Sequence, residues 1–340
     1  MSEMVDLNTE YLGLTLKNPL VPSSSPLTGN FDDARRLEDA GAAAIILPSL
    51  FEEALIHEQE NMARFLEHQD IGHFEADSFL PAPPQFLSTL DQYLERINRY
   101  KRAMNIPVIG SLNGTSLSGW VDHAKDLEEA GCDAIELNLY SINANKSESC
   151  DDIERQYLRI VHELSKVISV PFAVKLSPQI TSLTHFAARL EQAGARGLSL
   201  FNRFYQPDID LDSLQVAPRL HLSSSVECLL RIHWIALLRP QVTLGLAATG
   251  GFHDYRDALK ALLAGADVVH LCSLLLQQGP DAIGPLLEAI HEWMKEKEYQ
   301  SIQQLKGSLS YQHAIDPSAY ERANYLHVLD SYSPSPGVKI

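Results

Sequence analysis

Cysteine is scarce in this sequence, and its spacing argues against two kinds of site. The four cysteines, Cys132, Cys150, Cys228 and Cys272, are scattered over 340 residues and form no CxxC pair. Structural metal centres and iron–sulfur clusters are usually built from closely spaced cysteines, so we expect neither here. The four side chains are expected to be reduced thiols, mostly buried.

Long apolar runs and an excess of positive charge are also missing. No apolar run is long enough to span a membrane, and residues 1–13 lack the apolar segment of a signal peptide. The net charge of −17 argues against a surface for nucleic acid or anionic membranes, although it is compatible with a local positive pocket for an anionic ligand. We therefore expect a cytoplasmic protein whose partner is a small-molecule substrate.

The sequence does contain a repeated unit, in which a helix-like segment runs through Ala-Gly into a short apolar segment. It occurs at residues 37–47, 127–138, 190–202 and 262–272. The glycine can adopt the positive φ of a helix C-cap, and such units imply parallel strands joined by right-handed crossovers. Their number and length predict an α/β fold, a single (β/α)8 TIM barrel over residues 1–310 with insertions at the C-terminal face of the strands. Residues 311–340 are expected to form a surface-wrapping or flexible tail.

Eight short apolar segments are predicted as the barrel strands: residues 20–24, 43–47, 107–112, 133–138, 171–176, 197–201, 241–246 and 267–271. The second strand is followed by a long insertion, residues 48–90, that contains the run FLPAPPQF. Because an insertion after a strand lies at the catalytic face, we expect this one to cover the substrate. A second insertion, between Asn202 and Ser224, has the alternation of a small hairpin.

The ends of the last two predicted strands carry the pattern of a phosphate site. Gly250 and Gly251 follow the seventh strand, and Ser273 follows the eighth. Paired glycines let backbone N–H groups approach a phosphate, and a helix that begins near His253 adds a favourable dipole. Since the loops after these strands commonly bind phosphate in this architecture, we predict a phosphate site rather than an ordinary tight turn.

Polar side chains end the other predicted strands. Lys175 lies in the apolar fifth strand, where it needs an anionic partner such as a bound cofactor. Amides and a hydroxyl follow the third, fourth and sixth strands: Asn113, Asn138, Ser141, Asn143 and Asn202. Asparagine can hydrogen-bond both donors and acceptors of a heterocycle, and a serine can act as a general base if its proton can leave. We therefore predict a site for a phosphorylated heterocycle.

Taken together, these residues resemble the dihydroorotate dehydrogenase family, enzymes of pyrimidine biosynthesis that carry flavin mononucleotide (FMN) on a (β/α)8 barrel. The resemblance runs from NPLVPSSSP to EYQSIQQLKGSL, almost the whole chain. ELNLYSIN stands where the family has Glu-Leu-Asn-x-Ser-Cys-Pro-Asn. This match implies that Asn138 and Asn143 bind substrate and that Ser141 is the catalytic base, a residue that is cysteine or serine in the family.

The resemblance also implies a cofactor site. Lys175 matches the lysine that contacts the flavin and steadies negative charge on its reduced form, and Asn202 matches an asparagine that contacts the substrate and the flavin. FMN is expected to bind Ser24, Asn113, Lys175, Asn202, Thr249, Gly250, Gly251, Cys272 and Ser273, where Cys272 replaces a glycine usual in the family. Ser223 and Ser224 lie near the position of a glycine-rich phosphate turn of the family.

The departures from the family pattern concern the substrate half of the site. A lysine that touches flavin and substrate in the family is replaced by Pro48, which Ser49 follows, and Ile142 stands where a proline follows the base. The family's Gly-Leu-Pro-Asn loop is replaced by FLPAPPQF, which has no asparagine. Loss of one cationic contact to the dihydroorotate carboxylate costs about 1.5–3 kcal/mol, which weakens the case for that substrate.

The first hypothesis is an FMN-dependent oxidoreductase that oxidises dihydroorotate or a related cyclic amide by proton abstraction and hydride transfer to flavin. The alternatives are an FMN oxidoreductase with another substrate, a non-catalytic flavin- or phosphate-binding subunit of a redox complex, and a phosphosugar-type lyase or isomerase with Lys175 as a Schiff-base residue. The sequence has no GxGxxG motif for a nicotinamide cofactor, so the electron acceptor is expected to be a small soluble oxidant or a partner protein. The resemblance also implies a homodimer.

Overall fold

A ring of parallel strands forms the centre of the molecule. The computed structural model describes residues 5–69, 87–114, 116–203, 206–322 and 324–331. Its main strands are β3 (Leu20–Pro22), β4 (Ile45–Ile46), β6 (Val108–Asn113), β7 (Ala134–Leu139), β8 (Phe172–Leu176), β9 (Gly197–Leu200), β12 (Gly245–Thr249) and β13 (Val268–Leu271). They pair in the order β3-β13-β12-β9-β8-β7-β6-β4, with every pair parallel. The Ala43 N–H donates to the Leu20 carbonyl at 3.0 Å between the two end strands, so the barrel is nearly closed and the predicted fold is confirmed.

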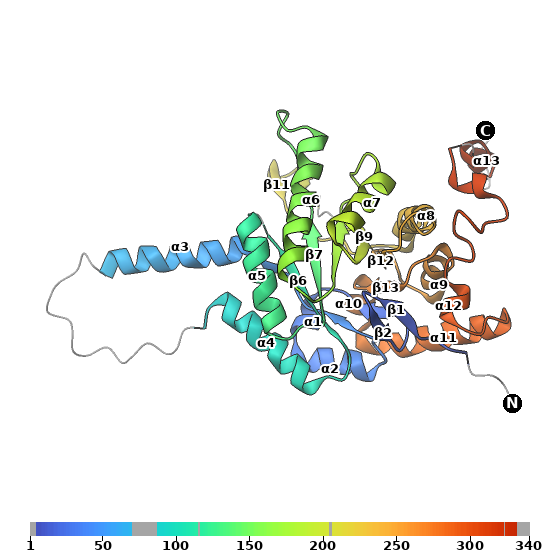
Figure 1. The fold of residues 1–340 in the computed structure, drawn as a ribbon, viewed down its shortest axis with the longest axis horizontal. Coiled ribbons are helices and arrows are strands. Elements are labelled where there is room, and N and C mark those ends of the chain that lie inside the picture. The colour runs from blue at the N-terminus through green and yellow to red at the C-terminus, as the bar shows by residue number, and fades with distance from the viewer. Residues whose placement is uncertain (1–4, 70–86, 115, 204–205, 323, 332–340) are drawn as a thin grey trace.

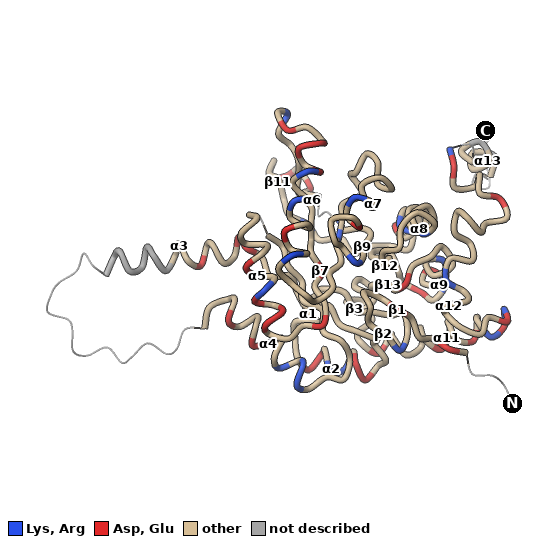
Figure 2. Tube along the Cα trace, viewed as in Figure 1, with Lys and Arg blue, Asp and Glu red and all other residues tan. Residues whose placement is uncertain are grey.

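Helices between the strands cover the outside of the barrel (Figure 1). They are α2 (Phe31–Asp39), α4 (Thr89–Ala103), α5 (Leu117–Glu129), α6 (Cys150–Val167), α7 (Leu183–Ala193), α8 (Cys228–Leu238), α9 (Tyr255–Ala264) and α11 (Ile283–Glu296). Short helices α1 (Pro26–Gly29), α10 (Ser273–Gln278) and α12 (Ile302–Leu305) lie beside them. The glycines of the four repeated units all have positive φ, between 94° and 124°, as the sequence predicted for helix ends. Positions of acidic and basic residues are spread along these outer helices (Figure 2).

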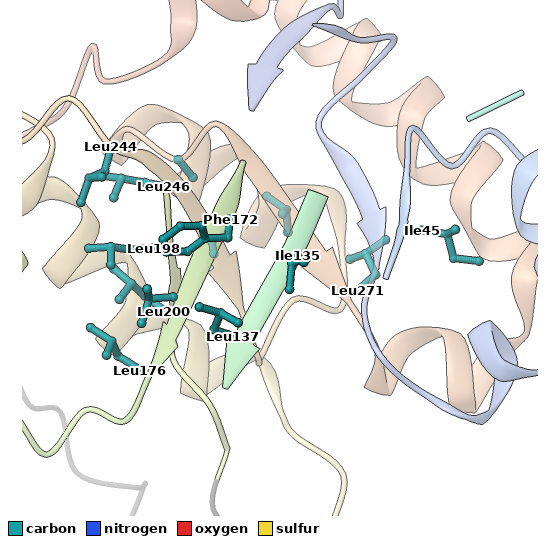
Figure 3. Packing of buried hydrophobic residues seen from close by; sticks show 14 of the residues in the cluster. Ile45, Ile135, Leu137, Phe172, Leu176, Leu198, Leu200, Leu244, Leu246 and Leu271 are labelled. Carbon is teal, nitrogen blue, oxygen red and sulfur yellow. The ribbon is translucent and has the colours of Figure 1, made fainter. Parts of the chain in front are cut away.

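The core has an outer and an inner layer because strand residues alternate in direction. On β7, Ile135 and Leu137 lie beside apolar residues of the neighbouring strands (Figure 3), in the cluster that also contains apolar residues of the outer helices. Ala134 belongs to the second cluster, inside the barrel. A hairpin of β1 (Thr9–Tyr11) and β2 (Leu14–Leu16) contributes Tyr11 and Leu16 to that inner cluster. This hairpin closes the N-terminal end of the barrel and leaves the C-terminal end for the site.

The seventh barrel strand differs most from its prediction. It was expected at residues 241–246, but β12 spans Gly245–Thr249. The N–H groups of Gln241 and Val242 both donate to the Leu238 carbonyl, so these residues finish the end of α8 instead of entering the sheet. Pairing begins where Gly245 lies opposite Gly197 of β9. The shift moves Thr249 from the predicted loop onto the strand.

The two insertions leave the C-terminal side of the barrel. The first forms β5 (Leu50–Phe51), which pairs with β6, and helix α3 (Glu52–Gln69), which extends away from the body (Figure 1). The run FLPAPPQF, predicted to cover the substrate, lies outside the described residues. The second insertion contains the predicted hairpin, formed by β10 (Asp208–Asp210) and β11 (Gln215–Ala217).

Short helical segments occupy the C-terminal part of the chain. Three are 3-10 turns, η1 (Ser225–Glu227), η2 (Pro280–Ala282) and η3 (Pro317–Tyr320), and the last α-helix is α13 (Asn324–Asp330). The tail beyond residue 310 therefore contains regular structure as far as it is described. Among the described helices, none has both the length and the hydropathy needed to cross a bilayer.

Candidate active site

A cavity of about 650 Å³ opens at the C-terminal ends of the barrel strands. This volume lies in the range of pockets that bind cofactors and small substrates. The structure brings ten of the predicted site residues to its wall: Ser24, Asn113, Asn138, Lys175, Asn202, Thr249, Gly250, Gly251, Cys272 and Ser273. They come from seven different strands or the loops that follow them, so the fold gathers residues that are far apart in sequence.

One end of the cavity is built to receive an anion. Gly250 and Gly251 have φ values of 91° and 94°, and a Cβ at Gly251 would lie 2.4 Å from the backbone nitrogen of Cys228. Only glycine fits this turn, which brings its backbone N–H groups to the cavity. The Ser223 hydroxyl lies 2.9 Å from the Ser273 hydroxyl and accepts a 3.3 Å hydrogen bond from the Gly251 N–H. These hydroxyl and N–H groups form a cluster suited to a phosphate.

Two basic side chains at this end were not predicted as site residues. His253 Nε2 lies 3.1 Å from the Ser223 hydroxyl oxygen. Arg231 is buried in α8, where its Nε donates to the Thr249 carbonyl at 3.0 Å, and burial lowers its pKa. A signal was available for Arg231, because a lone arginine in the apolar run CLLRIHWIALL needs a buried partner. It fixes the strand end from which the glycine turn departs.

At the opposite end, Lys175 enters the cavity from β8. Its Nζ donates to Glu136 Oε1 at 3.0 Å, and both side chains are buried. Glu136, which is only 1% exposed, is therefore the anionic partner that the sequence analysis required for Lys175 but did not identify within the chain. Burial alone would raise the pKa of Glu136, but the Lys175 ammonium outweighs it and holds that pKa below its usual value.

The wall between these two ends is polar but carries little charge. Asn138 Nδ2 donates to the Ser111 hydroxyl at 3.0 Å and to the Leu112 carbonyl at 3.1 Å, which fixes the amide. Pro48 and Ser49 line the cavity at the place where the resemblance would put a lysine. Among the described residues, the lysine and arginine side chains on the wall are Lys175 and Arg203, and Arg203 is paired with Glu227 at 3.1 Å.

Two predicted residues, Ser141 and Asn143, lie away from the cavity. The Ser141 hydroxyl donates to Asn143 Oδ1 at 2.5 Å and lies 2.8 Å from the Tyr157 hydroxyl of α6, and all three line a separate recess of about 60 Å³. Strand alternation accounts for this placement, because Asn138 and Tyr140 face the barrel mouth while Leu139 and Ser141 face the helices. Tyr140 enters the cavity instead and accepts a hydrogen bond from Asn113 Nδ2 at 3.1 Å.

Comparison with known proteins points to one family. The family model described as dihydroorotate dehydrogenase matches residues 86–294. A relative from Thermoplasma acidophilum, named dihydroorotate dehydrogenase B (NAD(+)), catalytic subunit, is 26% identical over 318 residues, which cover 89% of this chain and 99% of the relative. A relative of the same name from Petrotoga mobilis is 22% identical over 308 residues, covering 89% and 99%.

The family match covers more than half of the chain and includes the ends of β6, β7, β8, β9, β12 and β13 that line the cavity. Another relative of that name, from Lachnoclostridium phytofermentans, is 27% identical over 224 residues, or 64% of this chain and 74% of its own length. The family consists of flavin-dependent oxidoreductases that act on a CH–CH bond. A barrel with these residues at its mouth and this match along its sequence belongs to the dihydroorotate dehydrogenase family.

Proposed function

We propose that the chain binds FMN in the 650 Å³ cavity and oxidises dihydroorotate or a closely related cyclic amide. The observation that carries the proposal is the presence of a phosphate-type cluster and a buried lysine on the wall of one cavity. The cluster, at Gly251 and Ser273, suits the phosphate of FMN, and Lys175 suits the negative charge of the reduced flavin. The names of the relatives support the same substrate.

The residues of the chain fit FMN at both ends. Gly250, Gly251, Ser223 and Ser273 would hold the phosphate, and Lys175 would face the flavin ring together with Asn113 or Asn202. When bound, FMN supplies the acceptor for the two electrons that leave the substrate as hydride. Apolar side chains on the same wall, such as Phe201 and Phe252, are both buried and would exclude water from the flavin.

Two hydroxyls after β7 are candidates for removing the substrate proton. Ser141 is the candidate from the resemblance, but its hydroxyl is bonded to Asn143 outside the cavity, so it must turn inward to act. Tyr140 is the candidate from position, because it already lines the cavity. The amide of Asn113 donates to the Tyr140 oxygen at 3.1 Å, and this contact would stabilise the phenolate that takes the substrate proton once the phenol's own proton has passed to solvent.

A second candidate function is FMN-dependent oxidation or reduction of another substrate. Pro48 favours it, since this side chain lines the cavity and provides no cation for the carboxylate of dihydroorotate. Arg203 is a cation on the same wall, but Glu227 already pairs with it. A Schiff-base reaction at Lys175 is disfavoured by its ion pair with Glu136, because a nucleophilic amine must be neutral.

The electron acceptor is proposed to be a separate protein or a small soluble oxidant. The relatives are named as catalytic subunits, which favours a separate protein. We also propose a homodimer, from the resemblance alone. A non-catalytic role as a flavin-binding subunit would leave the cavity intact but abolish turnover, so an activity measurement separates it from the first proposal.

The test is steady-state formation of orotate from dihydroorotate by the FMN-loaded chain, with a dye as artificial electron acceptor. The proposal predicts turnover that depends on added FMN and is lost in Lys175→Met. Orotate formation at the rate of a no-enzyme control, with FMN bound, would favour the second candidate function. Failure of the chain to retain FMN would contradict both.

A further inference from the structure

Three ionisable side chains meet inside the barrel, and two of them, Lys175 and His270, line the cavity. Glu136 comes from β7, Lys175 from β8 and His270 from β13. The Lys175–Glu136 distance is 3.0 Å, and His270 Nδ1 lies 3.7 Å from Glu136 Oε2. The His270 side chain is 0% exposed and that of Glu136 is 1% exposed, so this group is screened from bulk solvent.

Two members of the group have incomplete bonding, because Glu136 Oε2 and His270 Nε2 are both buried without a hydrogen-bond partner, and of these two atoms the histidine nitrogen belongs to the side chain that can become a cation. The Nδ1 atom of His270 lies 3.4 Å from the Ser199 hydroxyl oxygen, whereas its Nε2 is buried and has no hydrogen-bond partner. His270 also contributes to the wall of the cavity. A buried ring nitrogen without a partner is unusual in a folded protein and marks a position where a ligand or a proton can bind.

The charges of the group balance when His270 is neutral, because one carboxylate then faces one ammonium. Burial lowers the pKa of His270 to about 4, with Lys175 acting in the same direction and Glu136 opposing, so the ring is neutral at neutral pH. Among the described residues, Tyr11 also faces the ring, in an edge contact with ring centroids 6.1 Å apart. The neighbouring strands place Val21 and Thr249 beside His270, and neither is ionisable in this range.

Reduction of a flavin in the cavity would disturb this balance. The reduced flavin carries a negative charge when its ring stays deprotonated, and Lys175 already neutralises Glu136. One buried negative charge would then lack a counterion, which is costly in an environment of low dielectric constant. His270 is the remaining group on the described wall that can become a cation by taking one proton.

We propose that His270 accepts a proton at Nε2 when the bound flavin is reduced, and so supplies the counter-charge that Lys175 alone cannot provide. This inference rests on the proposed function. Reduction takes two electrons and one proton into the flavin, either as hydride from the substrate or as electrons from a chemical reductant with a proton from solvent. A second proton passes from solvent to Nε2. Both protons leave again on re-oxidation. Proton uptake at neutral pH requires the pKa of His270 to rise past neutrality in the reduced state.

The test is the pH dependence of the flavin midpoint potential in the FMN-loaded chain, measured between about pH 6 and pH 8. We expect that reduction by two electrons takes up two protons in the wild type and one proton in His270→Gln. The glutamine keeps a hydrogen-bonding group but cannot take the proton. Ser199→Ala is the matched control, since it removes a neighbour of Nδ1 without removing an ionisable group, and it should keep two. The absorbance of the reduced state should be that of the anionic flavin, which excludes protonation of the flavin itself.

Three results would overturn the inference. These are one proton per two electrons in the wild type, equal proton numbers in the wild type and His270→Gln, or a neutral reduced flavin. The first and third need no variant, so the test does not depend on the stability of His270→Gln. A chain that binds FMN but gives any of these results contradicts only the role of His270. A chain that binds no FMN contradicts the proposed function as well.

Discussion

The turn at Gly251 permits a sharp prediction, because the chain offers a matched control. Gly251 and Gly131 have the same φ, 94°, but their surroundings differ. A Cβ at Gly251 would lie 2.4 Å from the Cys228 nitrogen and 2.9 Å from the Glu227 carbonyl carbon, whereas a Cβ at Gly131 would meet nothing within 4 Å. Alanine at either position therefore has the same backbone strain, and only Gly251→Ala adds a clash.

The expected losses of stability and of FMN affinity follow from the backbone strain and the clash. Positive φ costs a non-glycine residue about 1–2 kcal/mol, so both variants should lose about that much free energy of unfolding. In Gly251→Ala the turn must also move away from Cys228, which displaces its N–H groups from the phosphate. Hydrogen bonds to a charged group contribute about 1.5–3 kcal/mol, so the affinity for FMN should fall roughly 10- to 100-fold.

The assay is titration of the apoprotein with FMN and with riboflavin, which lacks the phosphate, followed by the quenching of flavin fluorescence. Gly251→Ala should weaken FMN binding to about the level of riboflavin and leave riboflavin binding unchanged. Gly131→Ala should bind both ligands as the wild type does. The reasoning is refuted if Gly251→Ala binds FMN normally, or if Gly131→Ala loses as much FMN affinity.

Three further predictions concern the substrate end of the cavity. In anaerobic stopped-flow measurements, Tyr140→Phe should slow flavin reduction by dihydroorotate about 100-fold, whereas Ser141→Ala should slow it less than about threefold. The reverse ranking would identify Ser141 as the base. Pro48→Lys should lower the KM for dihydroorotate about 10-fold by adding a cation to the wall, and an unchanged KM would show that the carboxylate binds elsewhere. Lys175→Met should lose about 3–5 kcal/mol of free energy of unfolding in chemical denaturation, because it leaves the buried Glu136 carboxylate without its counterion. The double variant with Glu136→Gln should recover part of this loss, and no recovery would contradict the ion-pair account.

Much of the fold was predictable because its signals are local. Each repeated unit places a glycine at a helix end, and the apolar segment that follows can only be a buried strand. The seventh strand was misplaced because Gln241–Leu246 is also apolar, and sequence alone does not show that Gln241 and Val242 finish α8. Register in a barrel depends on the partner strand, here through Gly197 opposite Gly245.

The site was predicted less evenly, for reasons that differ between residues. The glycine turn and Lys175 were found because their chemistry is unusual at a strand end. The family resemblance favours Ser141 as the base, whereas the alternation along ELNLYS puts Tyr140 on the same side as Asn138. Glu136 and His270 were not identified, because their partnership joins strands more than 130 residues apart and appears only when the barrel closes.

The most direct measurement is an anaerobic titration of the FMN-loaded chain with dihydroorotate, followed by the visible absorbance of the flavin. The account predicts that one equivalent of dihydroorotate per flavin bleaches the absorbance and yields one equivalent of orotate. A flavin that remains oxidised in excess dihydroorotate, yet is reduced by dithionite, would contradict the proposed substrate.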